Sequence, residues 1–174
     1  EKYQQHGGPS MAACFALLQQ SDTPIDDQTA FLKAHIFNWM IAAIDGHAKN
    51  YSIFLEGDGF RMTPLYDIMS AAPHHLRSGF RHKDLQLAMS VGRRGHYRLD
   101  KILPRHFDET AHSAGVPLEA RHRAVQEILT AAPGALHHAL ETMPDRMPTV
   151  IANQIVDHAA DRLGHIEAFA ATLG

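Results

Sequence analysis

The spacing of apolar side chains predicts a chain built mainly from helices. Between residues 26 and 44, apolar residues recur every three or four positions, as on the buried face of an amphipathic helix. Trp39 lies on that face, so we expect it in the core rather than in a ligand site. Proline or helix-capping residues precede the other expected helices, which cover 10–20, 104–114, 117–132, 134–142 and 148–173.

Strand signals are few and short. Residues 51–56 and 60–63 flank Gly57-Asp58-Gly59, a pattern typical of a β-hairpin, and 85–91 is expected to be a short strand in an irregular segment. With 174 residues, 45% of them hydrophobic, the chain can form one domain with an ordinary core. No run of 18 apolar residues exists, so a membrane-spanning protein is not expected.

Charge is unevenly distributed along the chain. The net charge is −3, yet eight of the 16 Lys and Arg residues fall between His74 and Arg105, where only two acidic residues occur. Such a segment can attract phosphate, an acidic partner or nucleic acid, or it can be a solvated loop face. No motif that reads nucleic acid accompanies it.

Cysteine and histidine usage excludes two kinds of site. Cys14 is the single cysteine and lies among apolar residues, so a buried thiol is expected and a disulfide framework is excluded. This usage fits a reducing cytoplasm. The 14 histidines show no His-Glu-x-x-His or Cys/His ligand spacing, so a structural transition-metal site is not expected.

The chemically most informative stretch begins at Asp45 and reads Asp-Gly-His-Ala-Lys-Asn, ending at Asn50. Asp67 follows Asp45 by 22 residues, beyond the expected hairpin. Protein kinases use this order of residues, in which the first Asp accepts the proton of the substrate hydroxyl and the Asn and second Asp hold Mg²⁺. A hairpin returns its end close to its start, so Asn50 and Asp67 are predicted to face one point. Gly46 is expected to let the backbone turn sharply after Asp45.

Several collinear motifs over about 100 residues resemble the C-terminal lobe of the HipA family of toxin–antitoxin kinases. The resemblance is carried by Lys2-Tyr3-Gln4 with Gly7-Gly8-Pro9, Phe37–Ile41, Asp45–Phe54, Thr63–Ala71, Asp84–Met89 and Asp100–Phe107. It implies a mainly α, kinase-like C-terminal lobe over 1–174, a helical bundle whose small β-hairpin carries the catalytic and metal-binding loops. The last 60 or so residues resemble the family's terminal helices in pattern only.

The resemblance assigns roles to five residues. Asp45 is the expected catalytic base, and Asn50 and Asp67 are the expected Mg²⁺ ligands that also hold ATP. Lys49 is expected to neutralise phosphate charge during catalysis, or else to be a solvated surface lysine. His47 belongs to the same catalytic loop, where bracing by hydrogen bonds is favoured over proton transfer.

Neighbouring motif residues are given no catalytic role. Ser52 and Tyr66 are expected to serve packing or backbone hydrogen bonding. The Lys2–Gln4 segment is read as the junction with an upper lobe and is assigned no chemistry.

The resemblance also implies what surrounds this lobe. Family members carry an upper, ATP-binding lobe before the Lys-Tyr-Gln segment, and no Gly-rich phosphate loop occurs in these 174 residues. We therefore expect a fragment of a larger serine/threonine protein kinase, inactive when isolated. The implied cofactors are ATP and Mg²⁺. The implied partners are a HipB-like DNA-binding antitoxin, DNA mainly through that antitoxin, and a protein substrate such as an aminoacyl-tRNA synthetase.

Two alternatives belong to other functional classes. The lobe could be a non-catalytic interaction module that binds an antitoxin or another chain, and an upper lobe that restores ATP binding would distinguish the two. It could also be a metal-dependent phosphohydrolase built on Asp45, His47 and Asp67. Such hydrolases need a denser set of metal ligands than this sequence supplies.

Overall fold

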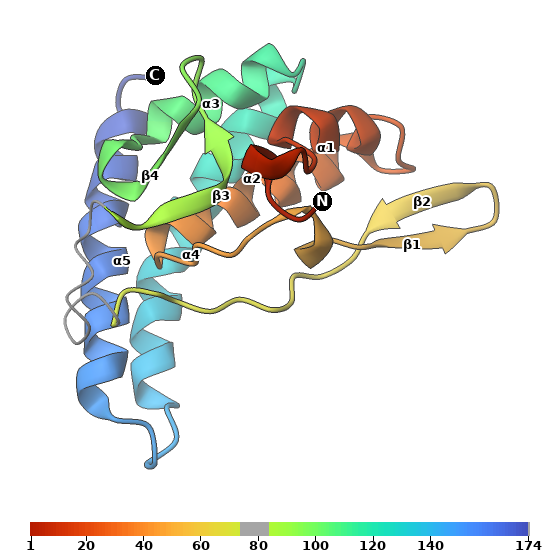
Figure 1. The fold of residues 1–174 in the computed structure, drawn as a ribbon. Helices are drawn as coiled ribbons and strands as arrows, with labels where there is room; N and C mark the ends of the chain where they lie inside the picture. The colour runs from red at the N-terminus through yellow and green to blue at the C-terminus, as the bar shows by residue number, and fades with distance from the viewer. Residues whose placement is uncertain (74–83, 174) are drawn as a thin grey trace.

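The computed structural model describes residues 1–73 and 84–173, and these residues form a mainly helical fold, as predicted. In Figure 1, α4 and α5 lie side by side and extend beyond the bundle, while the β1–β2 hairpin projects from another side. The described elements are η1 (Gln4–His6), α1 (Met11–Leu18), α2 (Pro24–Met40), η2 (Ala48–Asn50), β1 (Ile53–Glu56), β2 (Gly59–Met62), β3 (Gln86–Val91), β4 (His96–Arg98), η4 (Leu99–Lys101), α3 (Pro104–Ser113), α4 (Leu118–Glu141) and α5 (Thr149–Ala170).

Helix α2 forms the centre of the core. It packs against α1, α3, α4 and α5, and its side chains Phe31, Leu32 and Trp39 are each 1% exposed. Trp39 lies between Phe107, whose ring centroid is 5.8 Å away, and the guanidinium of Arg162, 4.3 Å from its ring. The prediction that Trp39 is a core residue is confirmed. Burial of each such side chain contributes about 1.5–3 kcal/mol to stability.

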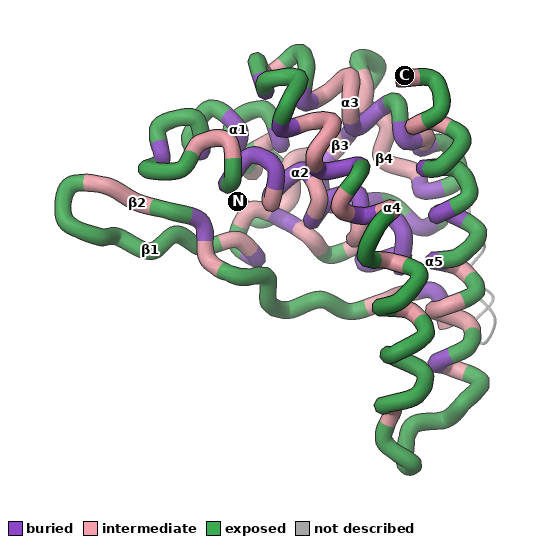
Figure 2. Tube along the Cα trace, turned by 180° about the vertical axis from the view of Figure 1, so that it is seen from behind, coloured by how far each residue is buried: buried purple, intermediate pink, exposed green. Residues whose placement is uncertain are grey.

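Burial is concentrated where the helices meet. Figure 2 shows buried segments along α2 and the facing part of α4, whereas most of the β1–β2 hairpin and the far ends of α4 and α5 are exposed. The hairpin is held at two points along β2. At its base, Asp27 of α2 accepts the backbone N–H of Met62 at 3.1 Å, and nearer the turn, Asp22 N–H donates to the carbonyl of Phe60 at 2.9 Å.

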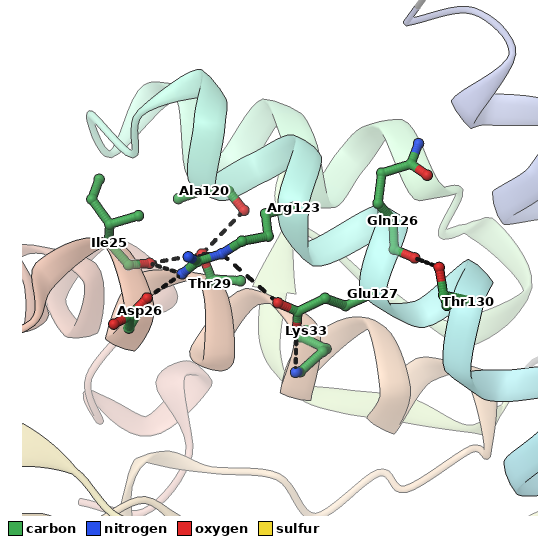
Figure 3. Close-up of polar contacts among 9 residues, drawn as sticks. All are labelled: Ile25, Asp26, Thr29, Lys33, Ala120, Arg123, Gln126, Glu127 and Thr130. Carbon is green, nitrogen blue, oxygen red and sulfur yellow. Dashed lines mark hydrogen bonds and ion pairs between the residues drawn. The ribbon is translucent and has the colours of Figure 1, made fainter.

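A polar cluster joins the start of α2 to α4 (Figure 3). Arg123 of α4 donates to the carbonyl of Ile25 at 3.2 Å and to the carboxylate of Asp26 at 2.7 Å. It also donates to the hydroxyl of Thr29, which itself donates to the carbonyl of Ile25. Because three different groups of α2 meet one guanidinium, the two helices are aligned in one register.

The predicted helix over 26–44 ends four residues early. Helix α2 stops at Met40, and Ala42 takes the left-handed conformation with φ 54°. That conformation costs an L-residue about 1–2 kcal/mol. Ala42 is fully buried and its carbonyl accepts the N–H of Ala71 at 2.9 Å, so tertiary contacts offset the cost. The apolar residues after Met40 fill the core from a bend, which the helical spacing did not reveal.

The prediction of separate helices at 117–132 and 134–142 is wrong. Helix α4 runs without interruption from Leu118 to Glu141 and contains Pro133. Proline removes one helical N–H donor and crowds the preceding turn, which normally breaks a helix. Here Ala132 and Leu136, on either side of the proline, pack against the core, and these contacts support the helix across it.

The hairpin predictions are confirmed and extended. Strands β1 and β2 pair from Ile53 with Met62 to Glu56 with Gly59, around a two-residue turn in which Gly57 has φ 59°. Strand β3 matches the predicted short strand at 85–91. It pairs with β4, a three-residue strand that the sequence did not predict because of its shortness.

Candidate active site

The loop after α2 positions Asn50 by its own backbone. Residues Ala48–Asn50 form the short helix η2, which begins after His47. The backbone N–H of His47 donates to Asn50 Oδ1 at 3.2 Å, and Asn50 N–H donates to the carbonyl of His47 at 2.9 Å. Asn50 is 6% exposed. These reciprocal bonds fix which end of the amide faces the loop, so Nδ2 points toward the segment that follows the hairpin.

Asp67, in the segment after β2, lies beside Asn50. Asn50 Nδ2 donates to Asp67 Oδ2 at 2.6 Å, which confirms that the hairpin brings these two residues together. Asp67 has φ 56°, a left-handed conformation that aspartate tolerates better than most residues. Left-handed non-glycine residues cluster at functional sites, where the surrounding structure must hold them.

Tyr66 and Ser52 lock the segment to the loop. The Tyr66 hydroxyl lies 2.7 Å from Ser52 Oγ and donates to the carbonyl of Lys49 at 3.1 Å. This agrees with the expectation that both residues serve backbone bonding rather than chemistry. The anchor fixes the residue next to Asp67 and so constrains the position of its carboxylate.

Three of the five predicted site residues line one cavity. Asp45, Asn50 and Asp67 all line it, together with neighbours from α2, the loop and the segment after β2. The carboxylate of Asp45 is half exposed, so solvent and ligands can reach it. The two carboxylates provide hard oxygen ligands and a candidate base in one place, whereas the Asn50 amide presents its Nδ2 donor to Asp67 and its Oδ1 to the loop.

His47 and Lys49 do not line this cavity. His47 is 3% exposed, and within the described part of the chain neither ring nitrogen has a hydrogen-bond partner. Its Nε2 lies 3.9 Å from Asp45 Oδ1, beyond hydrogen-bonding distance. The backbone of His47 braces the loop, whereas its ring packs edge-on against Tyr3 at 5.5 Å. Lys49 is exposed to solvent one position before Asn50.

The sequence did not reveal that Asp45 contacts the N-terminal segment. The Tyr3 hydroxyl donates to Asp45 Oδ1 at 2.5 Å, and Lys2 Nζ lies 3.8 Å from Oδ2. This hydrogen bond raises the pKa of the Tyr3 phenol, and burial and the negative charge of Asp45 raise it further. No chemistry had been assigned to Lys2 or Tyr3. They lie more than 40 residues before Asp45, and no local pattern marks such a contact.

Gln4 holds that segment in place. Its Oε1 accepts the backbone N–H of Ser90 at 2.9 Å, and its Nε2 donates to Ser90 Oγ at 3.0 Å. A double hydrogen bond between η1 and β3 is specific in orientation as well as position. Tyr3, next to Gln4, is therefore presented to Asp45 by an anchored backbone.

Gly46 is required for space rather than for an unusual backbone angle. It is not among the glycines with positive φ. A Cβ at this position would lie 2.5 Å from Asn38 Nδ2, which donates to the Tyr51 hydroxyl at 3.2 Å. The expected sharp turn at Gly46 is confirmed, because the N–H of His47 donates to the carbonyl of Asp45 at 2.8 Å across it. The absent side chain also allows close packing of the Asp45 loop on α2.

Two other sequence expectations concern the basic segment and Cys14. Arg77, Arg81 and Lys83 of the basic segment lie outside the described residues, and Arg98 of that segment pairs with Asp100 at 2.7 Å. Cys14 is a free thiol that is only partly buried, so the expectation of a buried thiol is met only in part.

Within the described residues, no group of three or more His, Cys, Asp or Glu side chains is arranged so that it could hold a metal ion. Within the same residues, no helix has the length and apolar character needed to span a membrane.

Sequence relatives are named as kinases. A family model described as HipA-like C-terminal domain matches residues 1–136. "Putative kinase Y4mE" of Sinorhizobium fredii is 31% identical over 161 residues, which cover 92% of this chain and 36% of that protein. The serine/threonine-protein kinase toxin HipA of Shewanella oneidensis is 33% identical over 63 residues, covering 36% of this chain and 14% of that protein.

A solved structure shows the same fold. It is the complex of HipA, HipB and operator DNA from the Shewanella oneidensis toxin–antitoxin system, and the match has a TM-score of 0.73 at 21% identity. It covers 94% of this chain and 38% of that chain, so the present chain spans little more than a third of either long relative. By its family match and its fold, this chain belongs to the HipA-like C-terminal domain family, which includes kinase toxins.

Proposed function

We propose that this chain is the C-terminal catalytic lobe of a serine/threonine protein kinase that transfers phosphate from Mg-ATP to a protein serine. The observation that carries the proposal is the cavity in which Asp45, Asn50 and Asp67 meet, with the amide of Asn50 2.6 Å from Asp67. Kinases use an Asp, an Asn and a second Asp in this chain order. Membership of a family that includes kinase toxins supports the same conclusion.

The donor set of the cavity fits a magnesium ion. Asp67 supplies a carboxylate, and Asn50 Oδ1 accepts one N–H from His47 but, as an amide oxygen, has a second lone pair. Mg²⁺ prefers such hard oxygens and is usually held by one or two protein ligands together with substrate phosphates. Asn50 and Asp67 would hold it. When bound, the ion neutralises charge on the β- and γ-phosphates.

Asp45 would act as the base. In the proposed reaction, the acceptor hydroxyl gives its proton to the Asp45 carboxylate as its oxygen forms a bond to the γ-phosphorus. The bond from that phosphorus to the bridging oxygen breaks, and ADP leaves with the electron pair. Lys49 is exposed beside Asn50, where its charge can compensate the phosphates. His47 contributes its backbone to the loop, and we assign its ring no proton transfer because of the 3.9 Å separation.

The surrounding assembly is part of the proposal. A complete kinase of this kind needs a phosphate-covering loop and an ATP-anchoring lysine, so the 174-residue chain alone should bind Mg-ATP weakly. HipA is solved together with HipB and operator DNA. We therefore propose a HipB-like antitoxin as partner, with DNA reached mainly through it. A cytoplasmic location and a translation protein such as an aminoacyl-tRNA synthetase as substrate follow from the family resemblance.

Two substitutions in the complete protein separate the proposed roles. Asp45→Asn should lower phosphate transfer by about 10²–10⁴-fold while the Kd for Mg-ATP, measured by calorimetry, changes little. Asp67→Asn should weaken Mg-ATP binding itself, because a hard anionic oxygen is lost. Asp58→Asn, on the exposed hairpin turn, is the matched control and should change neither quantity. Equal loss of nucleotide binding in the first two variants would show that the assigned roles are wrong.

A further inference from the structure

Asp45 also faces a second cavity. This cavity has a volume of about 340 Å³, within the usual range for ligand sites of about 300–1,000 Å³. Asn50 and Asp67 line only the first cavity, whereas Asp45 lines both. The second cavity lies between η1 and β3, and it is lined by Tyr3, Gln5, His6, Gln86, Leu87 and Ala88, with Ile44 beside Asp45.

We propose that the acceptor segment of the protein substrate binds in this second cavity and brings its hydroxyl to Asp45 from that side. The inference rests on the proposed kinase function and adds the place where the acceptor binds. A kinase base must touch the acceptor hydroxyl while the metal and nucleotide occupy other space. Because Asp45 lines both cavities while Asn50 and Asp67 line the first, an acceptor in the second one reaches the base without crossing Asn50 or Asp67.

Tyr3 marks where the acceptor hydroxyl would sit. Its phenol belongs to the wall of the second cavity and donates to Asp45 Oδ1 at 2.5 Å, the contact that a serine hydroxyl must make with its base. Lys2 Nζ lies 3.8 Å from the other carboxylate oxygen, Oδ2. The acceptor hydroxyl therefore takes the place of the Tyr3 hydroxyl at Oδ1, while Lys2 stays near Oδ2 of Asp45.

The walls of the cavity indicate the kind of segment it accepts. Gln5 Nε2 donates to Gln86 Oε1 at 3.1 Å, so two exposed amides meet across the cavity. Primary amides can exchange this bond for bonds to the backbone of an incoming peptide. Leu87 and Ala88 add apolar surface, and among the described residues that line the cavity, Asp45 is the only Asp, Glu, Lys or Arg. The fitting ligand is an extended peptide segment with a serine flanked by small, uncharged side chains.

Phosphate transfer to an acceptor in the second cavity makes and breaks the same bonds as the proposed reaction. The serine O–H bond breaks as its proton passes to Asp45, an oxygen–phosphorus bond forms, and ADP departs with the electrons of the cleaved bond. Tyr3 keeps its own proton throughout. Its hydroxyl moves off Oδ1 when the acceptor binds, which makes its hydrogen bond a competitor of the substrate.

The test uses the complete protein with ATP, Mg²⁺ and a peptide probe that has one serine flanked by alanine and glutamine. Gln86→Trp should fill the cavity and lower kcat/KM for the peptide by about tenfold or more, with KM for ATP unchanged. Gln20→Trp is the matched control, because Gln20 is equally an exposed glutamine but lines neither cavity, and it should behave as wild type.

Tyr3→Phe supplies an independent variant, since it keeps the ring and removes only the competing hydroxyl. It should lower KM for the peptide by about twofold or more. A wild-type peptide kcat/KM in Gln86→Trp, or a lower kcat with unchanged peptide KM in Tyr3→Phe, would overturn the acceptor site while leaving the kinase function standing. Absence of Asp45-dependent transfer in the wild-type protein would overturn both.

Discussion

Replacing Gly46 with alanine tests whether the Asp45 loop depends on close packing against α2. The added Cβ would lie 2.5 Å from Asn38 Nδ2, whereas ordinary contacts of this kind begin at 3.4 Å. The Asn38 amide would have to move by about 0.9 Å, the difference between those two distances. That movement breaks its 3.2 Å hydrogen bond to the Tyr51 hydroxyl.

The expected cost comes from two sources. Asn38 is 6% exposed, and within the described residues its Oδ1 already lacks a hydrogen-bond partner. Leaving a buried donor unpaired costs about 1–3 kcal/mol, and overpacking costs a similar amount. Partial relaxation makes these costs overlap, so we expect Gly46→Ala to destabilise the protein by about 2 kcal/mol. For a domain of this size, that lowers Tm by about 4–8 °C.

Urea and thermal unfolding of Gly46→Ala, Asn38→Ala, the double variant and Gly164→Ala test this packing argument. The double variant Asn38→Ala/Gly46→Ala should lose about 1 kcal/mol less than the sum of the single variants, because the smaller residue at 38 makes room for the methyl group. Gly164→Ala is the control: it lies exposed in α5 with nothing near its Cβ position and should be neutral or slightly stabilising. A Gly46→Ala variant as stable as wild type, or strict additivity with Asn38→Ala, would refute the packing argument.

Two further predictions concern His35, which is buried, and Cys14, which is partly buried. Burial lowers the pKa of His35 from 6.5 to about 3, so the unfolded chain takes up its proton first. The free energy of unfolding should therefore fall as the pH drops from 6.5 toward 3, by up to about 1.4 kcal/mol per pH unit. In His35→Phe, the unfolding free energy measured with urea should depend less steeply on pH in that window. An unchanged slope would contradict this. Burial also raises the pKa of the Cys14 thiol to about 11, so iodoacetamide at pH 8 should alkylate it more than tenfold more slowly than free cysteine, as followed by mass spectrometry. Equal rates in native and unfolded protein would count against it.

Local signals in the sequence predicted the main elements and the residues of the first cavity. The three-and-four spacing of apolar residues identified α2 and placed Trp39 in the core, because a helical period implies a buried face. The Gly-Asp-Gly turn identified the β1–β2 hairpin, which in turn explains why Asn50 and Asp67 meet. Chain order together with the family resemblance was enough to propose the roles of Asp45, Asn50 and Asp67, which remain predictions.

The tertiary structure decided the points that depend on contacts far apart in the chain. The left-handed Ala42 that follows α2 is stabilised by burial and by Ala71, and α4 continues through Pro133, where Ala132 and Leu136 pack against the core. The hydrogen bond from Tyr3 to Asp45 spans 42 residues, and the bonds from Gln4 to Ser90 span 86. Sequence patterns record the preferences of neighbouring residues, whereas these features come from the packing of distant segments. For that reason Asp45, Asn50 and Asp67 could be predicted from the sequence, but the second cavity beside Asp45 could not.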